Sequence, residues 1–138
     1  MKDGYDIFER GGATCLRVWG RDEKDLFSRA LLGLAAVVRP DVSPPGGEET
    51  RIRVHVHGED LGETLERFLS QVVFENEMHD AVFSAMDIIF FSHQEIECEL
   101  IGRKIEHTEE HVLNLHVGRH GIERKDGQYQ TEIVCDVL

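Results

Sequence analysis

The sequence predicts an α+β fold, in which two helices pack on one face of a largely antiparallel or mixed β-sheet. Two stretches carry apolar residues at helical spacing, and each begins with an acidic residue suited to an N-cap. Most of the remaining chain alternates apolar and polar residues, as half-buried strands do. The Asp-Gly pair at Asp126–Gly127 separates two such stretches and is typical of a tight hairpin turn. A length of 138 residues suits one domain spanning 1–138.

The first third of the chain predicts two strands followed by a helix. Strands are expected over Tyr5–Glu9 and Thr14–Trp19, with a turn at Gly11–Gly12 between them. Asp22 is the candidate N-cap of the first helix, and Arg39–Pro40 ends it because the residue before a proline disfavours helical geometry. The apolar face of this helix consists of Leu26, Phe27, Ala30, Leu31, Leu34 and Val38.

The middle of the chain predicts a loop, a strand and a second helix. Proline and glycine mark Asp41–Glu49 as a loop, and Arg51–Gly58 alternates as a strand. Asp60 is the candidate N-cap of the second helix, with Glu63 completing an acidic version of the capping box. The helix is expected to end near Met78. Its apolar stripe consists of Leu61, Leu65, Phe68, Leu69 and Val72.

The remaining residues predict strands only. These are expected over Ala81–Ser92, Ile96–Ile101, Val112–Val117, His120–Arg124 and Gln128–Leu138. Two early strands, two helices separated by a strand, and a final series of strands give the α+β class stated above.

Composition and charge exclude several classes of function. The formal net charge is -12 and no Lys/Arg cluster is present, which argues against strong direct binding of nucleic acid. The chain contains no apolar run long enough to cross a bilayer, and Met1–Gly4 does not open a secretory signal, so a cytoplasmic protein without membrane attachment is expected. Cys15, Cys98 and Cys135 are widely spaced and odd in number, which predicts buried, reduced thiols.

The last strand places an acidic side chain two residues before the end of the sequence. Alternation puts Asp136 on one face with Val134 and Leu138. The opposite face is formed by Tyr129, Thr131, Ile133, Cys135 and Val137. A carboxylate at this position is either a solvated strand end or a ligand for a hard cation.

Two histidine patterns suggest metal chemistry elsewhere. His55 and His57 share one strand face and could hold a transition metal if a neighbouring element supplied a third ligand. Arg51 and Arg53 share that face and would repel a cation, so a solvated face is the alternative.

The second pattern is His107-Thr108-Glu109-Glu110-His111, which matches the H-x-x-E-H motif of some zinc peptidases. On a helix, His107 and His111 would bind zinc while Glu110 acted as general base. The surrounding residues predict a loop entering a strand, which favours a chance match over a zinc hydrolase.

A series of stretches along the whole chain carries a family resemblance. The stretches are Tyr5–Gly20, Asp25–Phe27, Ala30–Leu34, Val54–Gly58, Asp60–Leu61, Leu65–Leu69, Asp126–Tyr129 and Cys135–Leu138. In this order they resemble the archease family. The resemblance implies a single archease-like domain over 1–138.

Archeases are small cytosolic accessory proteins for RNA ligases of the RtcB type, which seal tRNA exons during splicing and other RNA breaks. The resemblance implies a chaperone-like activator that promotes guanylylation and turnover of such a ligase and is not itself an enzyme. It also implies a site for a divalent cation, calcium or a similar ion. Asp136 and the terminal backbone at Val137 and Leu138 match one half of that site, and Glu9 matches the acid that opens the family's N-terminal motif.

The N-terminal half of the implied site departs from the family pattern. Where the family reads Asp/Glu-His-Thr-Ala-Asp, this chain reads Glu9-Arg10-Gly11-Gly12-Ala13. Ala13 replaces the metal-binding Asp and has no donor atom, so the cation site is expected to be altered. Arg10 could pair with Asp136 in place of the ion or contact a partner. The alternative to a ligase activator is therefore a non-catalytic protein-binding module that keeps the fold without the metal.

Overall fold

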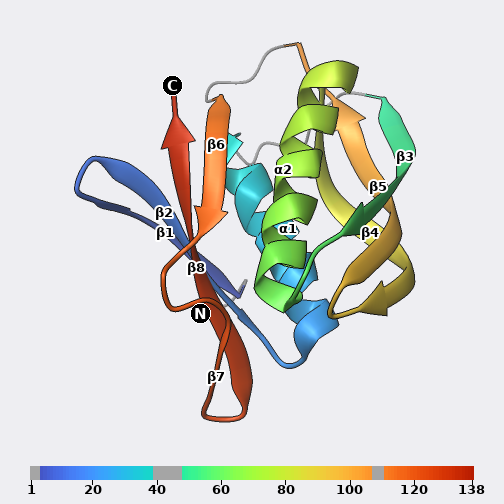
Figure 1. The fold of residues 1–138 in the computed structure, drawn as a ribbon. Helices are drawn as coiled ribbons and strands as arrows, with labels where there is room; N and C mark the ends of the chain where they lie inside the picture. The colour runs from blue at the N-terminus through green and yellow to red at the C-terminus, as the bar shows by residue number, and fades with distance from the viewer. Residues whose placement is uncertain (1–3, 39–47, 107–110) are drawn as a thin grey trace.

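Both helices lie between two antiparallel β-sheets in the structure, a computed structural model that describes residues 4–38, 48–106 and 111–138 (Figure 1). The five-stranded sheet has the order β1 (Tyr5–Arg10), β2 (Ala13–Gly20), β8 (Gln128–Val137) and β6 (Val112–Val117), with β7 (Glu123–Lys125) paired to β8. The three-stranded sheet has the order β3 (Glu49–His57), β5 (Glu95–Lys104) and β4 (Ala81–Ser92). The helices are α1 (Glu23–Val38) and α2 (Leu61–His79).

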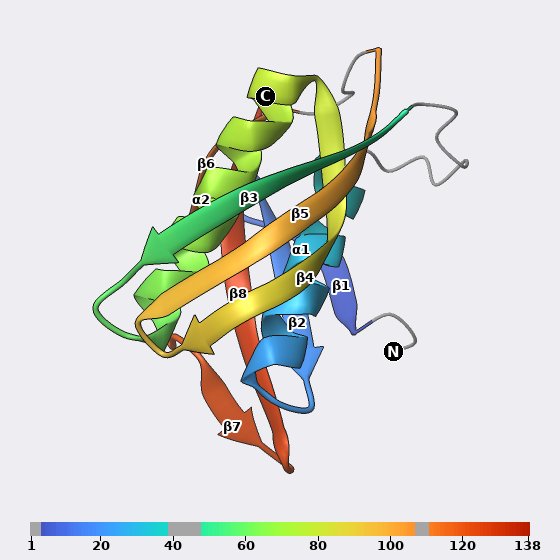
Figure 2. The same ribbon diagram turned by 90° about the vertical axis from the view of Figure 1, so that its right-hand side faces the viewer.

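The expected α+β class with two helices and antiparallel strands is confirmed, and the strands divide between two sheets rather than forming one. Helix α1 contacts β1, β2 and β8 on one side and β4 on the other. Helix α2 contacts β6 on one side and β3, β4 and β5 on the other (Figure 2). Each helix therefore buries two faces, which explains why their apolar surfaces extend beyond a narrow stripe.

The apolar core is continuous through the helix layer. The Phe27 ring of α1 lies 5.8 Å from the Phe68 ring of α2 and 5.0 Å from the Phe91 ring of β4. Leu16 and Ile133, which face each other across β2 and β8, are fully buried beneath α1. The largest fully buried side chains are Phe27, Phe68, Phe83, Leu16, Leu26, Leu31, Leu34, Leu65, Leu69, Ile96, Leu100 and Ile133.

Both predicted helix starts are confirmed by their hydrogen bonds. The Asp25 N–H donates to Asp22 Oδ1 at 2.7 Å at the start of α1. At α2, the Glu63 N–H donates to Asp60 Oδ1 at 2.8 Å. The Glu63 carboxylate in turn accepts a hydrogen bond from the Glu59 N–H at 2.9 Å. Carboxylates therefore accept from backbone N–H groups both before and within the first turn of α2.

The hairpin between β7 and β8 turns at the predicted Asp-Gly pair. Asp126 has φ 53° and Gly127 has φ 78°, and positive values at both central residues match the twist of the flanking strands. The preceding strand is shorter than expected over His120–Arg124 and begins only at Glu123. A turn occupies the residues before it, where the Gly121 N–H donates to the Gly118 carbonyl at 2.9 Å and Gly121 has φ 61°.

The three cysteines are free and buried, as expected. Burial raises the pKa of both the Cys98 and the Cys135 thiols to about 12, so these two side chains stay protonated and unreactive at neutral pH. Neither helix, among the residues that the structure describes, is both long and apolar enough to cross a membrane. Most of the loop expected over Asp41–Glu49 lies outside the described residues, and Glu49 already begins β3.

Candidate functional site

The face of the five-stranded sheet that points away from the helices carries the candidate site. We call it the outer face. The strand register determines which residues lie on this face. Arg17 of β2 lies opposite Glu132 of β8, whereas the next pair, Leu16 and Ile133, is buried on the inner side. The outer positions of the central strands are Cys15, Arg17 and Trp19 on β2 and Gln130, Glu132, Val134 and Asp136 on β8. This face therefore joins polar side chains from both ends of the chain.

Two arginines and one glutamate form an ion-pair cluster on the outer face. Arg17 donates from Nη2 and Nε to Glu132 Oε2 at 2.9 and 3.2 Å, and Arg10 donates from Nη1 to Glu132 Oε1 at 3.0 Å. Both guanidinium groups also lie over the Phe8 ring, at 4.9 Å for Arg17 and 5.1 Å for Arg10. The hydrogen bonds from Arg17 lower the pKa of Glu132 most, burial opposes them, and the hydrogen bond from Arg10 lowers it further.

A pocket of about 420 Å³ opens beside this cluster. Its wall is completed by β6 and by the turn before β7, which contribute His116, Arg119 and His120. The full lining is Arg10, Arg17, His116, Gly118, Arg119, His120, Gly121, Glu123, Gln130, Thr131, Glu132 and Val134. Three arginines and two histidines outnumber two glutamates there, so the pocket is locally basic on a chain whose net charge is -12.

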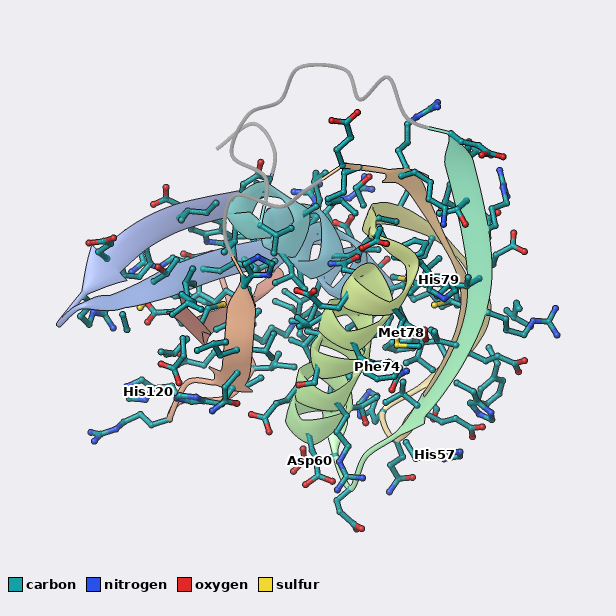
Figure 3. The ribbon with its side chains drawn as sticks, turned by 90° about the horizontal axis from the view of Figure 1, so that it is seen from above. His57, Asp60, Phe74, Met78, His79 and His120 are labelled. Atoms are coloured by element: carbon teal, nitrogen blue, oxygen red, sulfur yellow. The ribbon has the colours of Figure 1, made fainter. Side chains whose placement is uncertain are left out.

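Arg119 is the cation of this pocket that is available to a partner. Arg10 and Arg17 are both held by Glu132. Within residues 4–38, 48–106 and 111–138, Arg119 has no ion-pair partner, and both it and His120 are exposed. Figure 3 shows His120 at the edge of the molecule, pointing away from the helices. A guanidinium in this setting suits a carboxylate or phosphate group brought by another molecule.

Asp136 lies on the outer face, as alternation predicted, and its side chain is exposed. Its cross-strand neighbour on β6 is Asn114. The Leu138 N–H donates to the His111 carbonyl at 2.9 Å, and the Leu138 side chain is exposed. The start and the end of the chain do meet, because β2 pairs with β8 as far as Thr14 and Cys135.

Glu9 and Asp136 are not brought together. Glu9 lies opposite Thr14, and Thr14 lies opposite Cys135, so Glu9 is on the helix side of the sheet while Asp136 is on the outer face. The suggested ion pair between Arg10 and Asp136 is also not made. The Arg10 side chain runs back over Phe8 to Glu132, where stacking and a charged hydrogen bond act together.

Asp136 gains no carboxylate ligand from position 9 or from position 13. Ala13, at the turn end of β2, offers no donor, and Glu9 is on the other face. Within the described ranges, no group of three clustered His, Cys, Asp or Glu ligands includes Asp136. A hard cation such as calcium prefers six to eight oxygen ligands, so the binding of an ion by Asp136 and Leu138 stays a prediction.

Of the residues that line the pocket, only Arg10 was expected from the sequence to contact a partner. Arg17 and Glu132 occupy outward positions of two strands, which the alternation pattern does indicate. Their pairing depends on the register between β2 and β8, which are separated by most of the chain. Arg119 falls between the strands expected over Val112–Val117 and His120–Arg124, so no local pattern indicated its place in the pocket wall.

The H-x-x-E-H motif lies largely outside the described residues, which exclude 107–110. His111 is described, and its Nδ1 lies 2.9 Å from Glu77 Oε1 on α2. A zinc hydrolase centred on His107, Glu110 and His111 therefore stays a prediction from sequence.

Comparisons with known proteins agree with this fold. The model of the Archease protein family (MTH1598/TM1083) matches residues 5–137. The solution structure of protein 1598 from Methanobacterium thermoautotrophicum superposes with a TM-score of 0.69 and 18% identity, covering 97% of this chain and 99% of that one. A crystal structure from Thermotoga maritima, described as an archease and possible chaperone (TM1083), superposes with a TM-score of 0.63 and 13% identity, covering 95% of each chain.

No match was found among curated protein sequences. At identities below 20%, the two solved structures establish the shared fold, while the family model, which spans residues 5–137, establishes membership of the family. The chain belongs to the archease family.

Proposed function

We propose that this protein is an accessory factor for an RNA ligase of the RtcB type and promotes the guanylylation and turnover of that ligase. The observation that supports this most strongly is the family match over residues 5–137, which covers both strands of the N-terminal hairpin and the final strand. The Thermotoga relative is described as a possible chaperone, and an accessory role of this kind fits a protein that changes another protein's activity.

The outer face is the surface that we assign to the ligase. Its pocket is basic in a chain of net charge -12, so a partner that meets it must present carboxylate or phosphate groups there. Phe8, held under two guanidinium groups, gives the same face an aromatic element of the kind enriched at protein interfaces. The ion pairs of Glu132 fix Arg10 and Arg17 in place before a partner arrives, which lowers the entropic cost of binding.

No step of this proposal passes through a bound cation. This protein binds the ligase through a complementary surface. Its binding stabilises the state of the ligase that accepts the guanylyl group. The chemistry of guanylylation and of RNA joining belongs to the ligase.

The test is RNA ligation by the RtcB-type ligase of the same organism, with and without this protein. With RNA in large excess over ligase, the protein should increase the number of ligation events per ligase molecule. With ligase in excess and already guanylylated, a single round of joining should change little. Equal turnover with and without the protein, across guanosine triphosphate and divalent-ion concentrations, would argue against the activator role.

A protein-binding module without a cation is the second candidate, and the positions of Ala13 and Glu9 favour it over a metal-dependent activator. On this reading the protein binds a partner through the outer face without stimulating it. A stable complex with the ligase, together with unchanged turnover, would distinguish this function from the first.

A further inference from the structure

We propose that His55, His57 and Glu95 form a binding site for a divalent transition-metal ion of the zinc class, on the exposed side of the three-stranded sheet. Imidazole nitrogens are preferred ligands of zinc, copper and nickel, and two histidines with one carboxylate are a known ligand set for zinc. The site is separate from the outer face described above and does not depend on the ligase.

Strand pairing brings the three ligands together. His55 and His57 are two apart on β3 and so point to the same side, and His57 lies opposite Glu95 of β5 in the register. The two imidazole rings have their centroids 4.6 Å apart. His55 Nε2 is in direct contact with Glu95 Oε2, and His57 Nε2 lies 4.0 Å from the same oxygen.

The ligand atoms are close to the spacing that a metal ion requires. One atom from each residue lies within 4.8 Å of the other two. Zinc bonds of about 2.0–2.2 Å in a tetrahedral arrangement place ligand atoms about 3.4 Å apart. The imidazole side chains are 45% and 66% exposed, so small rotations about their side-chain bonds can close the remaining distance.

The arginines on the same face do not oppose the ion, because carboxylates neutralise them. Arg51 donates to Glu49 at 3.2 Å and to Glu99 at 3.0 Å. Arg53 lies 3.9 Å from Glu97, the residue opposite His55 in the register. A third carboxylate for Arg51 is that of Asp87 on β4, at 3.6 Å. Arg51 and Arg53 therefore leave little unpaired positive charge to repel an ion at the two histidines.

Three protein ligands leave a fourth position of a tetrahedral ion open to solvent. Structural zinc sites are usually closed by four protein ligands, whereas an open position can take water or a side chain from another molecule. In the order of the three-stranded sheet, β3 is an edge strand, so the ion would be reachable from outside. Figure 3 shows His57 and His120 at opposite sides of the molecule, which separates the metal site from the basic pocket.

The test is metal titration of the untagged full chain after chelator treatment. Calorimetry with zinc chloride should give one ion per chain, and cobalt(II) should show the visible absorption of a tetrahedral ion with nitrogen and oxygen ligands. The double variant His55→Ala/His57→Ala should lose this binding. Glu95→Gln should weaken it by at least about tenfold, because the carboxylate charge is lost.

The control is the double variant His116→Ala/His120→Ala, which removes the same number of exposed histidines from the basic pocket and should bind zinc like the wild type. Circular dichroism of each variant confirms that the fold is intact. Absence of zinc binding by the wild type would overturn the proposal. So would equal binding by His55→Ala/His57→Ala, or binding that is lost only in His107→Ala.

Discussion

Glu132 is the residue on which the geometry of the outer face depends. It accepts hydrogen bonds from Arg17 and Arg10 at once, and both guanidinium groups also lie over Phe8. Without this carboxylate, two cations about one aromatic ring would repel each other. The cluster can therefore be tested by removing one negative charge.

We expect Glu132→Gln to lower the free energy of unfolding at neutral pH by about 1 kcal/mol, the size of a partly exposed charged hydrogen bond. The pKa of Glu132 is lowered from its ordinary value of 4.5, so the wild-type advantage is fully present above pH 4.5 and is lost as pH falls through the folded-state pKa. Urea unfolding at several pH values measures this difference. Glu123→Gln, an exposed acid of the same pocket, is the control and should change little.

Cation binding by Asp136 can be tested by thermal stability. If Asp136 and Leu138 bind calcium or manganese, millimolar ion should raise the melting temperature of the wild type by mass action. Asp136→Ala should abolish that shift. Because Ala13 and Glu9 do not complete the site, we expect binding no tighter than about millimolar. A thermal-shift titration distinguishes millimolar from micromolar binding. Micromolar binding would require further oxygen ligands besides those of Asp136 and Leu138.

The chemistry of single residues was only partly predictable from the sequence. Alternation correctly placed Asp136 away from the core, and the His55–His57 pair on one exposed face. It could not show that Glu95 lies beside that pair, or that Arg10 forms its ion pair with Glu132 and not with Asp136. Both contacts join strands that no short turn connects, so no hairpin geometry fixes in the sequence which residues face each other.

At the scale of elements, the local signals predicted both helices and most of the strands. Both helices begin at the acidic caps that the sequence indicated, and β4 spans the predicted Ala81–Ser92. The error at His120–Arg124 has a local cause. Gly121 adopts a positive φ that turns the chain, and this glycine was included in an expected strand.

Strands β4 and β5 pack closely at Gly102. A Cβ added to Gly102 would lie 2.3 Å from the Val82 carbonyl oxygen and 2.8 Å from Phe83 Cα, and neither backbone atom can move without distorting the strand pairing. We expect Gly102→Ala to lower the free energy of unfolding by about 1–3 kcal/mol or more, as overpacking does. Equilibrium unfolding in urea measures the loss.

Gly62→Ala is the matched control for this substitution. A Cβ at Gly62, in the first turn of α2, would lie no closer than 3.6 Å to a neighbouring atom, that of Asp60 Oδ1. Alanine is favoured over glycine in a helix, so this variant should be neutral or more stable by up to about 1 kcal/mol. Equal effects of the two substitutions would contradict the account of packing given for Gly102.

At the scale of the whole molecule, the division of the strands between two sheets could not be predicted from the sequence. The apolar residues of α1 and α2 predict burial, but periodicity does not say whether one sheet or two cover a helix. The division has a functional consequence. The basic pocket and the His55–His57–Glu95 group lie on different sheets, so the molecule presents two chemically distinct outward surfaces.

The outer face of the five-stranded sheet is the surface we assign to the ligase, and a pair of charge reversals tests that assignment. Arg119→Glu reverses a charge in the basic pocket, whereas Arg53→Glu makes the same change on the three-stranded sheet. Both residues are exposed, so both variants should fold. The measurement is the number of RNA ligation events per RtcB-type ligase molecule in the presence of each protein.

We predict that the wild type and Arg53→Glu raise ligase turnover to the same extent, and that Arg119→Glu raises it at least about tenfold less, as expected when a charge opposes binding at an interface. Stimulation by Arg119→Glu equal to that of the wild type, or no stimulation by any of the three proteins, would contradict the account.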